Sequence, residues 1–255
     1  MLLLAEYGYW KLMSMRDLFD LSLKTMRLIP AMAKRILKIG IPSGITQAIM
    51  ATAGMVVQSL TNSMGETVIA CNVIVMRVDG FAMLPNMTFG QAMSVYTGQN
   101  VGAQKFDRVH MGVKQGSLIA VAFSTAITLV LLFLSPILFG FFTDTPALID
   151  LATRMIRLMA VGYICIAITQ VLGGVMRGAG DTVSPMWISI ISTIIVRIPV
   201  AYLIAHLTRS AEYPHGQPIA LFGSLMFSWV MGMVISVIVF SLGKWKKKMY
   251  VVAQV

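Results

Sequence analysis

Asp79 is the one acidic residue that lies deep inside an apolar stretch of this 255-residue sequence. At a helical rise of about 1.5 Å per residue, it lies about 18 Å from the start of its predicted helix, near the middle of a bilayer. Arg197 reaches a similar depth in a later stretch. Charged side chains at this depth are costly, and they commonly mark ion pathways, proton relays or substrate contacts. Asp79 is therefore our candidate for coupling to an ion.

Two interpretations of Asp79 compete. In the first, its carboxylate pairs with Arg77 or Arg197 and stays ionised as part of the structure. In the second, it faces a cavity and takes up a proton or a cation during transport. For Arg197 we favour a structural role, in which its guanidinium satisfies a backbone carbonyl that Pro199 leaves without a donor.

Amides and other polar or small side chains recur at helical spacing on four of the apolar stretches, where they form stripes. A single stripe is most simply explained by close helix packing, because small residues permit approach and amides bond across an interface. Several stripes together indicate a shared polar cavity. The candidate cavity residues are Gln47, Gln58, Asn62, Asn72, Met83, Asn86, Tyr163, Gln170 and Arg197.

The elements that must position these residues are membrane-spanning helices. The chain is 57% hydrophobic and only 12% charged, whereas soluble domains carry about 25% charged residues. A span needs about 20 apolar residues, and six runs are long enough. They cover roughly 36–64, 67–99, 111–142, 147–176, 185–207 and 218–243. We therefore predict an all-α, polytopic membrane protein with one six-helix domain over 36–243.

The two ends differ from this core. Residues 1–35 mix basic and apolar side chains and are predicted to form an amphipathic segment on the membrane surface. Residues 244–255 open with a basic cluster and form a tail. Six spans put both termini on one side, and the basic residues near 105–114 and Arg177 share that side. The positive-inside rule makes it cytoplasmic.

Several classes of function are excluded by the pattern. The net charge of +10 comes largely from residues that flank apolar runs, so it sets topology and does not indicate a nucleic-acid partner. The sequence holds no metal-ligand spacing, cofactor fingerprint or nucleophile–base arrangement. We expect neither an enzyme nor a bound metal or cofactor.

Several motifs, in order, resemble the carboxy-terminal lobe of the multidrug and toxic compound extrusion (MATE) family. The most specific is Met-Arg-Gly-Ala-Gly-Asp-Thr at 176–182, followed by Pro-Met at 185–186 and Arg-Ile-Pro-Val-Ala-Tyr at 197–202. Earlier words agree: Lys-Ile-Gly-Ile-Pro-Ser-Gly at 38–44, Val-Gln-Ser at 57–59, Asn-Ser-Met-Gly at 62–65 and Gly-Gln-Asn-Val-Gly-Ala at 98–103, then Asp-Arg at 107–108.

This resemblance implies a bacterial exporter of two six-helix lobes in the plasma (inner) membrane. Such exporters work by alternating access and exchange inward-moving H+ or Na+ for amphipathic organic cations. Only one lobe is present in this sequence, so a second lobe, either a missing amino-terminal half or a second copy, is the expected partner. The resemblance makes 1–35 a cytoplasmic inter-lobe segment. Asp79 stays a candidate from its position alone, because the family motifs do not place a coupling carboxylate there.

Two other functions are compatible with the sequence. A lipid-linked oligosaccharide flippase of the same superfamily would use a cationic cavity, which Arg77 and Arg197 permit. A truncated or non-transporting membrane subunit would have the same six helices. The MATE-like motifs at 98–103 and 178–182 favour the exporter over these two alternatives.

Overall fold

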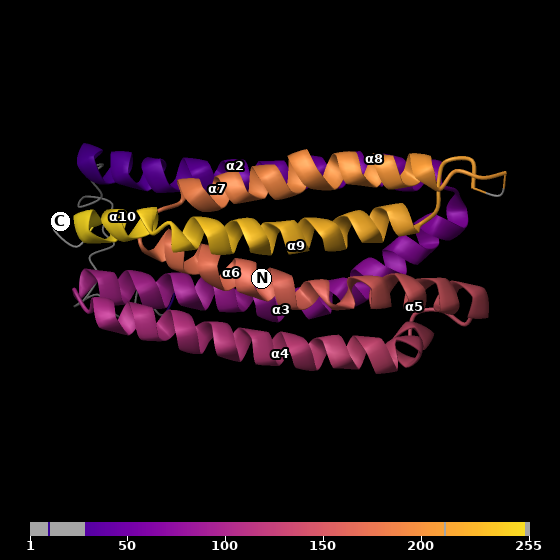
Figure 1. The fold of residues 1–255 in the computed structure, drawn as a ribbon, viewed down its shortest axis with the longest axis horizontal. Helices are drawn as coiled ribbons and strands as arrows, with labels where there is room; N and C mark the ends of the chain where they lie inside the picture. Colours follow the sequence, from indigo (N-terminus) through magenta and orange to yellow (C-terminus); the bar gives the residue numbers. More distant parts are fainter. Residues whose placement is uncertain (1–9, 11–28, 212, 253–255) are drawn as a thin grey trace. The chain divides into compact units, whose positions relative to one another are not determined.

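The computed structural model describes Trp10, 29–211 and 213–252, and within these residues the regular structure is entirely helical (Figure 1). The chain divides into two compact units, 1–40 and 41–255. The helices are α2 (Pro30–Ser63), α3 (Glu66–Gly102), α4 (Phe106–Gly140), α5 (Pro146–Ala160), α6 (Gly162–Gly178), α7 (Val183–Ser189), η1 (Ile190–Arg197), α8 (Ile198–Leu207), α9 (Ile219–Ser241) and α10 (Lys244–Val252).

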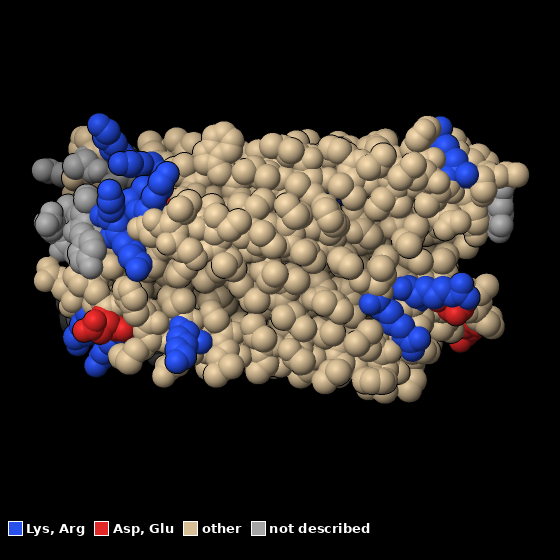
Figure 2. Space-filling view, viewed as in Figure 1, with Lys and Arg blue, Asp and Glu red and all other residues tan. Residues whose placement is uncertain are grey.

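The predicted all-α membrane fold is confirmed. Five helical stretches of the described chain are each long and apolar enough to cross a membrane, and α5 with α6 make a sixth if this bent pair is one span. Figure 2 shows Lys, Arg, Asp and Glu side chains near the helix ends of the face in view, with uncharged surface between them. That distribution suits a protein whose middle lies in hydrocarbon.

The fourth predicted span, expected to run unbroken over 147–176, is bent by 45° between α5 and α6. The break adjoins Gly162, where a Cβ atom would lie 2.6 Å from a ring carbon of Trp229 on α9. The absent side chain lets the Trp229 ring pack against the break. The ring of Tyr163, the next residue, lies 5.3 Å from that of Trp229, centroid to centroid.

The fifth span is continuous in length but changes its helical type. Residues Ile190–Arg197 form a π-helix between α7 and α8. The Ser228 hydroxyl of α9 donates a 2.8 Å hydrogen bond to the carbonyl of Ser192, inside this segment. A side chain that bonds a helical carbonyl competes with the α-helical ladder, so this contact is a local cause of the wider turn.

The hairpin between α6 and α7 is a tight turn whose backbone groups are satisfied locally. Gly180 has φ 84°, and the amide of Asp181 donates to the carbonyl of Met176 at 2.8 Å while that of Gly180 donates to Arg177 at 3.0 Å. These two bonds are a Schellman motif, which needs a left-handed residue at the position of Gly180. The turn therefore fixes where α7 begins.

Of the two predicted end segments, only the carboxy-terminal one is largely described by the structure. Most of 1–35 lies outside the described residues, so its prediction remains untested. The basic tail forms α10, in which Trp245 and Met249 are buried. The Trp245 ring stacks on Phe240 with centroids 4.8 Å apart, and its indole N–H donates to the Phe240 carbonyl at 3.0 Å. The tail is thus packed against the helical bundle.

Candidate functional site

A polar cavity of about 380 Å³ opens among α2, α3, α6, α7, η1 and α9, within 41–255. Its polar wall consists of hydroxyls, amides and two guanidinium groups, and no Asp or Glu of the described chain lines it. The polar lining residues are Ser43, Thr46, Gln47, Gln91, Thr169, Gln170, Arg177, Thr182, Ser189, Ser192, Thr193, Arg197 and Ser228. Polar side chains from six helical elements that converge at membrane depth are the arrangement expected of a transport site.

Four of the predicted cavity residues line this cavity: Gln47, Met83, Gln170 and Arg197. They come from four different helical elements, and their common position arises from the way those elements pack. Polar residues at helical spacing on the fifth span share one face, because Ser189, Thr193 and Arg197 all lie on the cavity wall.

Close contact between α3 and α6 holds one side of the cavity in place. A Cβ atom at Gly90 would lie 2.9 Å from the carbonyl oxygen of Gln170, and one at Gly178 would lie 2.7 Å from the Cβ of Thr97. A Cβ atom at Gly174 would overlap the backbone of Gly90. Small residues four apart let two membrane helices approach closely, and here the approach sets the angle at which Gln170 enters the cavity.

Asp79 lies outside the cavity lining, in a polar cluster next to it. The Tyr163 hydroxyl donates a 2.6 Å hydrogen bond to the Asp79 carboxylate. Arg197, which does line the cavity, interacts electrostatically with Asp79. The ring of Trp229 also lines the cavity and contacts Tyr163. Asp79 is therefore connected to the cavity wall through Tyr163 and Trp229, and by charge to Arg197.

The expected arginine roles differ from what the structure contains. Among the described residues Asp79 has no arginine within ion-pair distance, and the Arg77 guanidinium lies 6.0 Å from the ring centroid of Phe142. The expected hydrogen bond from Arg197 to a carbonyl freed by Pro199 is not among the contacts of the described residues, and the Arg197 Nε is buried without a partner. The expectation assumed an α-helix, but the residues before Pro199 are π-helical.

Three other candidates form a chain of amides on an open face of α2. Gln58 donates to Asn62 at 2.8 Å, and Asn72 of α3 donates to Gln58 at 3.5 Å. Gln58 and Asn62 line a shallow groove along α2, apart from the cavity.

Asn86, the remaining candidate, lies away from the cavity and faces α4. Its side-chain oxygen accepts a 2.6 Å hydrogen bond from the Ser124 hydroxyl, and its side-chain nitrogen is buried without a partner. Met83, three residues earlier, does line the cavity. Helical spacing alone therefore did not predict which polar residues of α3 face α4.

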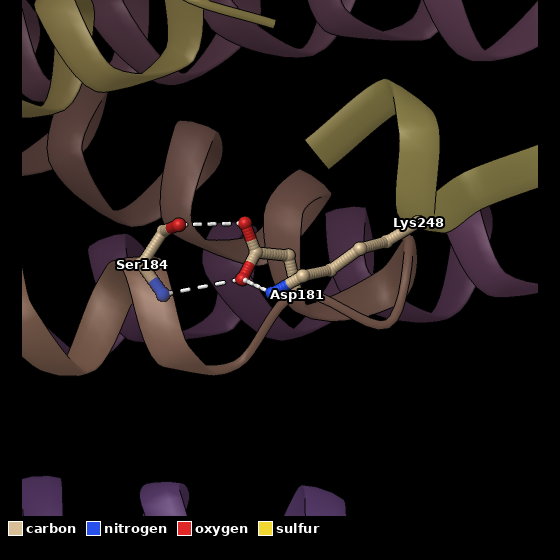
Figure 3. Close-up of polar contacts among 3 residues, drawn as sticks. All are labelled: Asp181, Ser184 and Lys248. Atoms are coloured by element: carbon tan, nitrogen blue, oxygen red, sulfur yellow. Dashed lines mark hydrogen bonds and ion pairs between the residues drawn. The ribbon is translucent and has the colours of Figure 1, made fainter. Parts of the chain in front are cut away.

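A second polar cluster, which sequence reasoning missed, joins the hairpin to the tail (Figure 3). Lys248 of α10 lies 2.7 Å from the buried Asp181 carboxylate. That carboxylate also accepts hydrogen bonds from the Ser184 hydroxyl at 2.6 Å and the Ser184 amide at 3.2 Å. Asp181 thus caps α7. We call this group, Asp181, Ser184 and Lys248, the tail clasp.

The clasp also determines the charge state of Asp181. Burial by itself raises the pKa of the Asp181 carboxyl, but the hydrogen bonds from Lys248 and Ser184 outweigh burial, so the pKa lies below its ordinary value. Asp181 therefore stays ionised at neutral pH. The sequence signal for the cap is Asp181, which follows a glycine turn and precedes Ser184 by three residues. The sequence gives no signal that pairs Asp181 with Lys248, which lies 67 positions away.

The fold is that of a multi-pass helical membrane protein with a polar cavity between its helices. The sequence model of the MatE family matches residues 42–203, more than half of the chain. The chain therefore belongs to the MATE family, as its motifs predicted.

Curated relatives and solved structures agree with this assignment. The chain is 27% identical over 220 residues to "Probable multidrug resistance protein YoeA" of Bacillus subtilis (strain 168), covering 81% of this chain and 47% of the relative. It is 22% identical over 215 residues to "Probable multidrug resistance protein NorM" of Thermotoga maritima, covering 84% of this chain and 45% of the relative. The chain spans about half the length of the curated relatives it matches.

A crystal structure of a MATE protein in the bent conformation has the same fold. It superposes with a TM-score of 0.77 at 18% identity, over 97% of this chain and 52% of that one. The named relatives are called probable multidrug resistance proteins, in line with the expectation of a transporter and not an enzyme.

Proposed function

We propose that this chain is one lobe of a secondary multidrug exporter and works together with a second six-helix lobe. The observation that carries the proposal is the polar cavity at membrane depth, whose wall comes from six helical elements of this lobe. Transport would follow alternating access, with inward flow of H+ or Na+ driving export of amphipathic molecules such as the organic cations typical of the family.

The exposed surface of α2 supports the need for a second lobe. Between Ile41 and Ser63 only Ala53, Val57, Leu60 and Thr61 are buried. Gln58 and Asn62 lie on its open side. Gln58 and Asn62 bond each other, but each amide has more donors and acceptors than these bonds use, and hydrocarbon offers no further partner. A second lobe over this face would remove that cost.

Asp79 is the proposed ion-coupling residue of this lobe. Its carboxylate has one strong donor, Tyr163, and a nearby positive charge, Arg197, which itself lines the cavity. A proton or cation arriving at Asp79 would change its attraction to Arg197 and so alter the charge presented to the cavity. That link from ion to cavity is what coupling requires.

Vesicle reconstitution at controlled density tests the proposal. Purified chain is placed in liposomes with an imposed pH or Na+ gradient, and efflux of the cationic dye ethidium is followed. We expect no efflux at less than one chain per vesicle. Efflux should appear at higher density if a second copy completes the transporter, or on adding the amino-terminal lobe of YoeA if a missing half does. Efflux from single chains, or none in any arrangement, would refute the proposal.

The Asp79→Asn variant tests the coupling role in the assembly that transports. Gradient-driven efflux should fall to the leak level, whereas Asp150→Asn, at an exposed ion pair on α5, should transport normally. Full coupled efflux by folded Asp79→Asn would remove Asp79 from the mechanism.

The second candidate function is transport of lipid-linked pyrophosphate substrates. It is favoured by one observation, the two arginines on a cavity wall with no described carboxylate. Competition between ethidium and a lipid-linked oligosaccharide distinguishes the two functions. If the lipid-linked substrate alone is translocated, the flippase function holds and the drug-export function is refuted.

We also propose that both termini are cytoplasmic in the plasma membrane. Basic residues of the 105–114 segment lie at the same end as the tail, since the rings of His110 and Trp245 are 6.3 Å apart. This end carries the Lys244–Lys248 cluster, as the positive-inside rule requires of a cytoplasmic face. Green fluorescent protein fused after Val255 should fluoresce, and alkaline phosphatase fused there should be inactive; the reverse result would invert the topology.

A further inference from the structure

Arg177 is a cationic group on the cavity wall that no described residue neutralises. It lies in the last turn of α6 and lines the cavity. The carboxylate closest to it in sequence, Asp181, is already bound by Lys248 and Ser184. The other cavity arginine, Arg197, interacts electrostatically with the Asp79 carboxylate. The positive charge of Arg177 is thus uncompensated among the described residues.

The position of the guanidinium depends on a glycine. A Cβ atom at Gly173 would lie 3.2 Å from Nη1 of Arg177. The Arg177 side chain therefore runs back along α6, as helical geometry directs side chains toward the N-terminus, and its head occupies the space that Gly173 leaves. This places the guanidinium along the cavity-facing helix and away from the turn at 179–182.

A purely structural role for Arg177 leaves its hydrogen-bonding capacity unused. An arginine at a helix C-terminus is stabilised by the helix dipole and often bonds the last carbonyls. Here the described structure contains no hydrogen bond from the Arg177 side chain. The Schellman bonds already satisfy the backbone carbonyls of Met176 and Arg177. A half-buried guanidinium with five donors and no acceptor is costly unless an acceptor binds it.

The surroundings of Arg177 suit an amphiphile with an anionic group. Arginine binds carboxylates and phosphates through two parallel hydrogen bonds. The hydroxyl of Ser189 lines the same cavity as a further donor, and Met83 and Met87 give it an adaptable apolar part. No described carboxylate lines the cavity to repel such a ligand.

We propose that Arg177, in the space beside Gly173, binds the phosphate or carboxylate group of an amphiphilic ligand in the cavity. The inference names an anionic ligand class for the cavity, which favours the second candidate function over export of organic cations. It rests on the proposed function only in taking that cavity as the substrate site. Its test measures binding and needs no transport. Binding without efflux would support this site and refute the proposed transport. Efflux without binding that depends on Arg177 would support transport and refute this site.

Two amphiphiles with the same alkyl chain and opposite charge provide the test. Dodecyl phosphate and dodecyltrimethylammonium are titrated into the full chain in uncharged maltoside micelles, with micelle-only heats subtracted. We expect dodecyl phosphate to bind at least about tenfold more tightly, because a charge-assisted hydrogen bond is worth about 1.5–3 kcal/mol, a factor of ten or more. Competition by phosphatidylglycerol or by inorganic phosphate then identifies a lipid headgroup or a free anion as the source.

Variants assign the preference to Arg177. Arg177→Gln should lose about tenfold or more in phosphate binding, and Arg177→Lys should keep part of it. Gly173→Ala should weaken binding with every charge intact, because it displaces the guanidinium. Arg157→Gln, which removes an exposed charge on α5, is the matched control. Equal binding by wild type and folded Arg177→Gln, equal losses in Arg177→Gln and Arg157→Gln, or tighter binding of the ammonium amphiphile would each overturn the proposal.

Discussion

The tail clasp should hold α10 on the bundle, and Lys248→Met tests this directly. The substitution keeps the unbranched stem of the side chain, one atom shorter, and removes the ion pair with Asp181, which is 2.7 Å long. The Asp181 carboxylate would then remain 1% exposed with only its two Ser184 hydrogen bonds. A buried charge that loses a partner is destabilising, so the cost should fall first on the docking of α10.

The magnitude follows from the unequal burial of the two partners. Removing one partner from a fully buried pair costs about 3–5 kcal/mol, whereas an exposed pair contributes about 0–1 kcal/mol. Lys248 is 46% exposed, and Ser184 continues to stabilise the carboxylate. We therefore expect a loss of about 1–2 kcal/mol, which makes the open state of α10 about 5–30 times more populated.

Amide hydrogen exchange of residues 245–252 measures that opening. Exchange in this segment should accelerate about 5–30-fold in Lys248→Met, while exchange in α4 and α9 should not change. Lys247→Met is the matched control, because Lys247 is exposed and the described structure gives it no ion pair. If the two variants exchange equally, the clasp does not hold the tail and the reasoning fails.

The clasp also predicts how docking depends on pH. The folded pKa of Asp181 is below its unfolded value, so the stabilisation is fully present above about pH 3.9 and is lost as the pH falls through the lower folded pKa. The fluorine resonance of 5-fluorotryptophan at Trp245, assigned with Trp245→Phe, should stay constant from neutral pH to about 5 and change only below about 4. Asp181→Asn should remove this acid transition. A transition near neutral pH, or one that survives in Asp181→Asn, would contradict the assignment.

Two further substitutions test the packing and the polar cluster. Gly174→Ala should lower the thermal unfolding midpoint and reduce the free energy of unfolding by about 1–3 kcal/mol, because its Cβ meets the backbone of α3. Gly80→Ala is the control, since the space around Gly80 is open, and it should leave the midpoint unchanged. Equal effects of the two substitutions would contradict the close contact. Tyr163→Phe removes the donor to Asp79 and should cost about 1.5–3 kcal/mol in unfolding if the carboxylate is ionised. Tyr202→Phe, exposed on α8, is its control, and a matching small effect would show that the hydroxyl contributes nothing.

The helices were predictable because lipid restricts the choices. A backbone in hydrocarbon must satisfy its own hydrogen bonds, so an apolar run of sufficient length is a helix whatever it packs against. The two departures depend on distant partners that the sequence does not pair. The break before Gly162 accommodates Trp229, and the π-helix follows from the contact of Ser228 with Ser192.

The cavity was predictable only in part, for a related reason. Periodicity reports which residues share a face of one helix, but not what that face meets. Met83 lines the cavity while Asn86, on the same stripe, bonds Ser124 of α4. The rotation of α3 about its axis depends on the close contact between its backbone at Gly90 and the backbone of α6. Helical periodicity does not report such a contact. The partner of Asp79 was missed in the same way, since Tyr163 lies 84 positions away.

The π-helical segment gives the fifth span room for one residue fewer. A π-helix is bonded from residue i to residue i+5, one residue further than an α-helix, so deleting one residue between Ile190 and Arg197 would let the segment pair as an α-helix and leave both flanks close to their present faces. A deletion at the start of α8 has no such room, because each residue turns an α-helix by about 100° and advances it by about 1.5 Å. The rest of α8 would then rotate by roughly a quarter turn, and Ala205, now buried, would leave its contacts. The fifth span should therefore tolerate the loss of one codon in the π-helical segment better than the loss of one codon in α8.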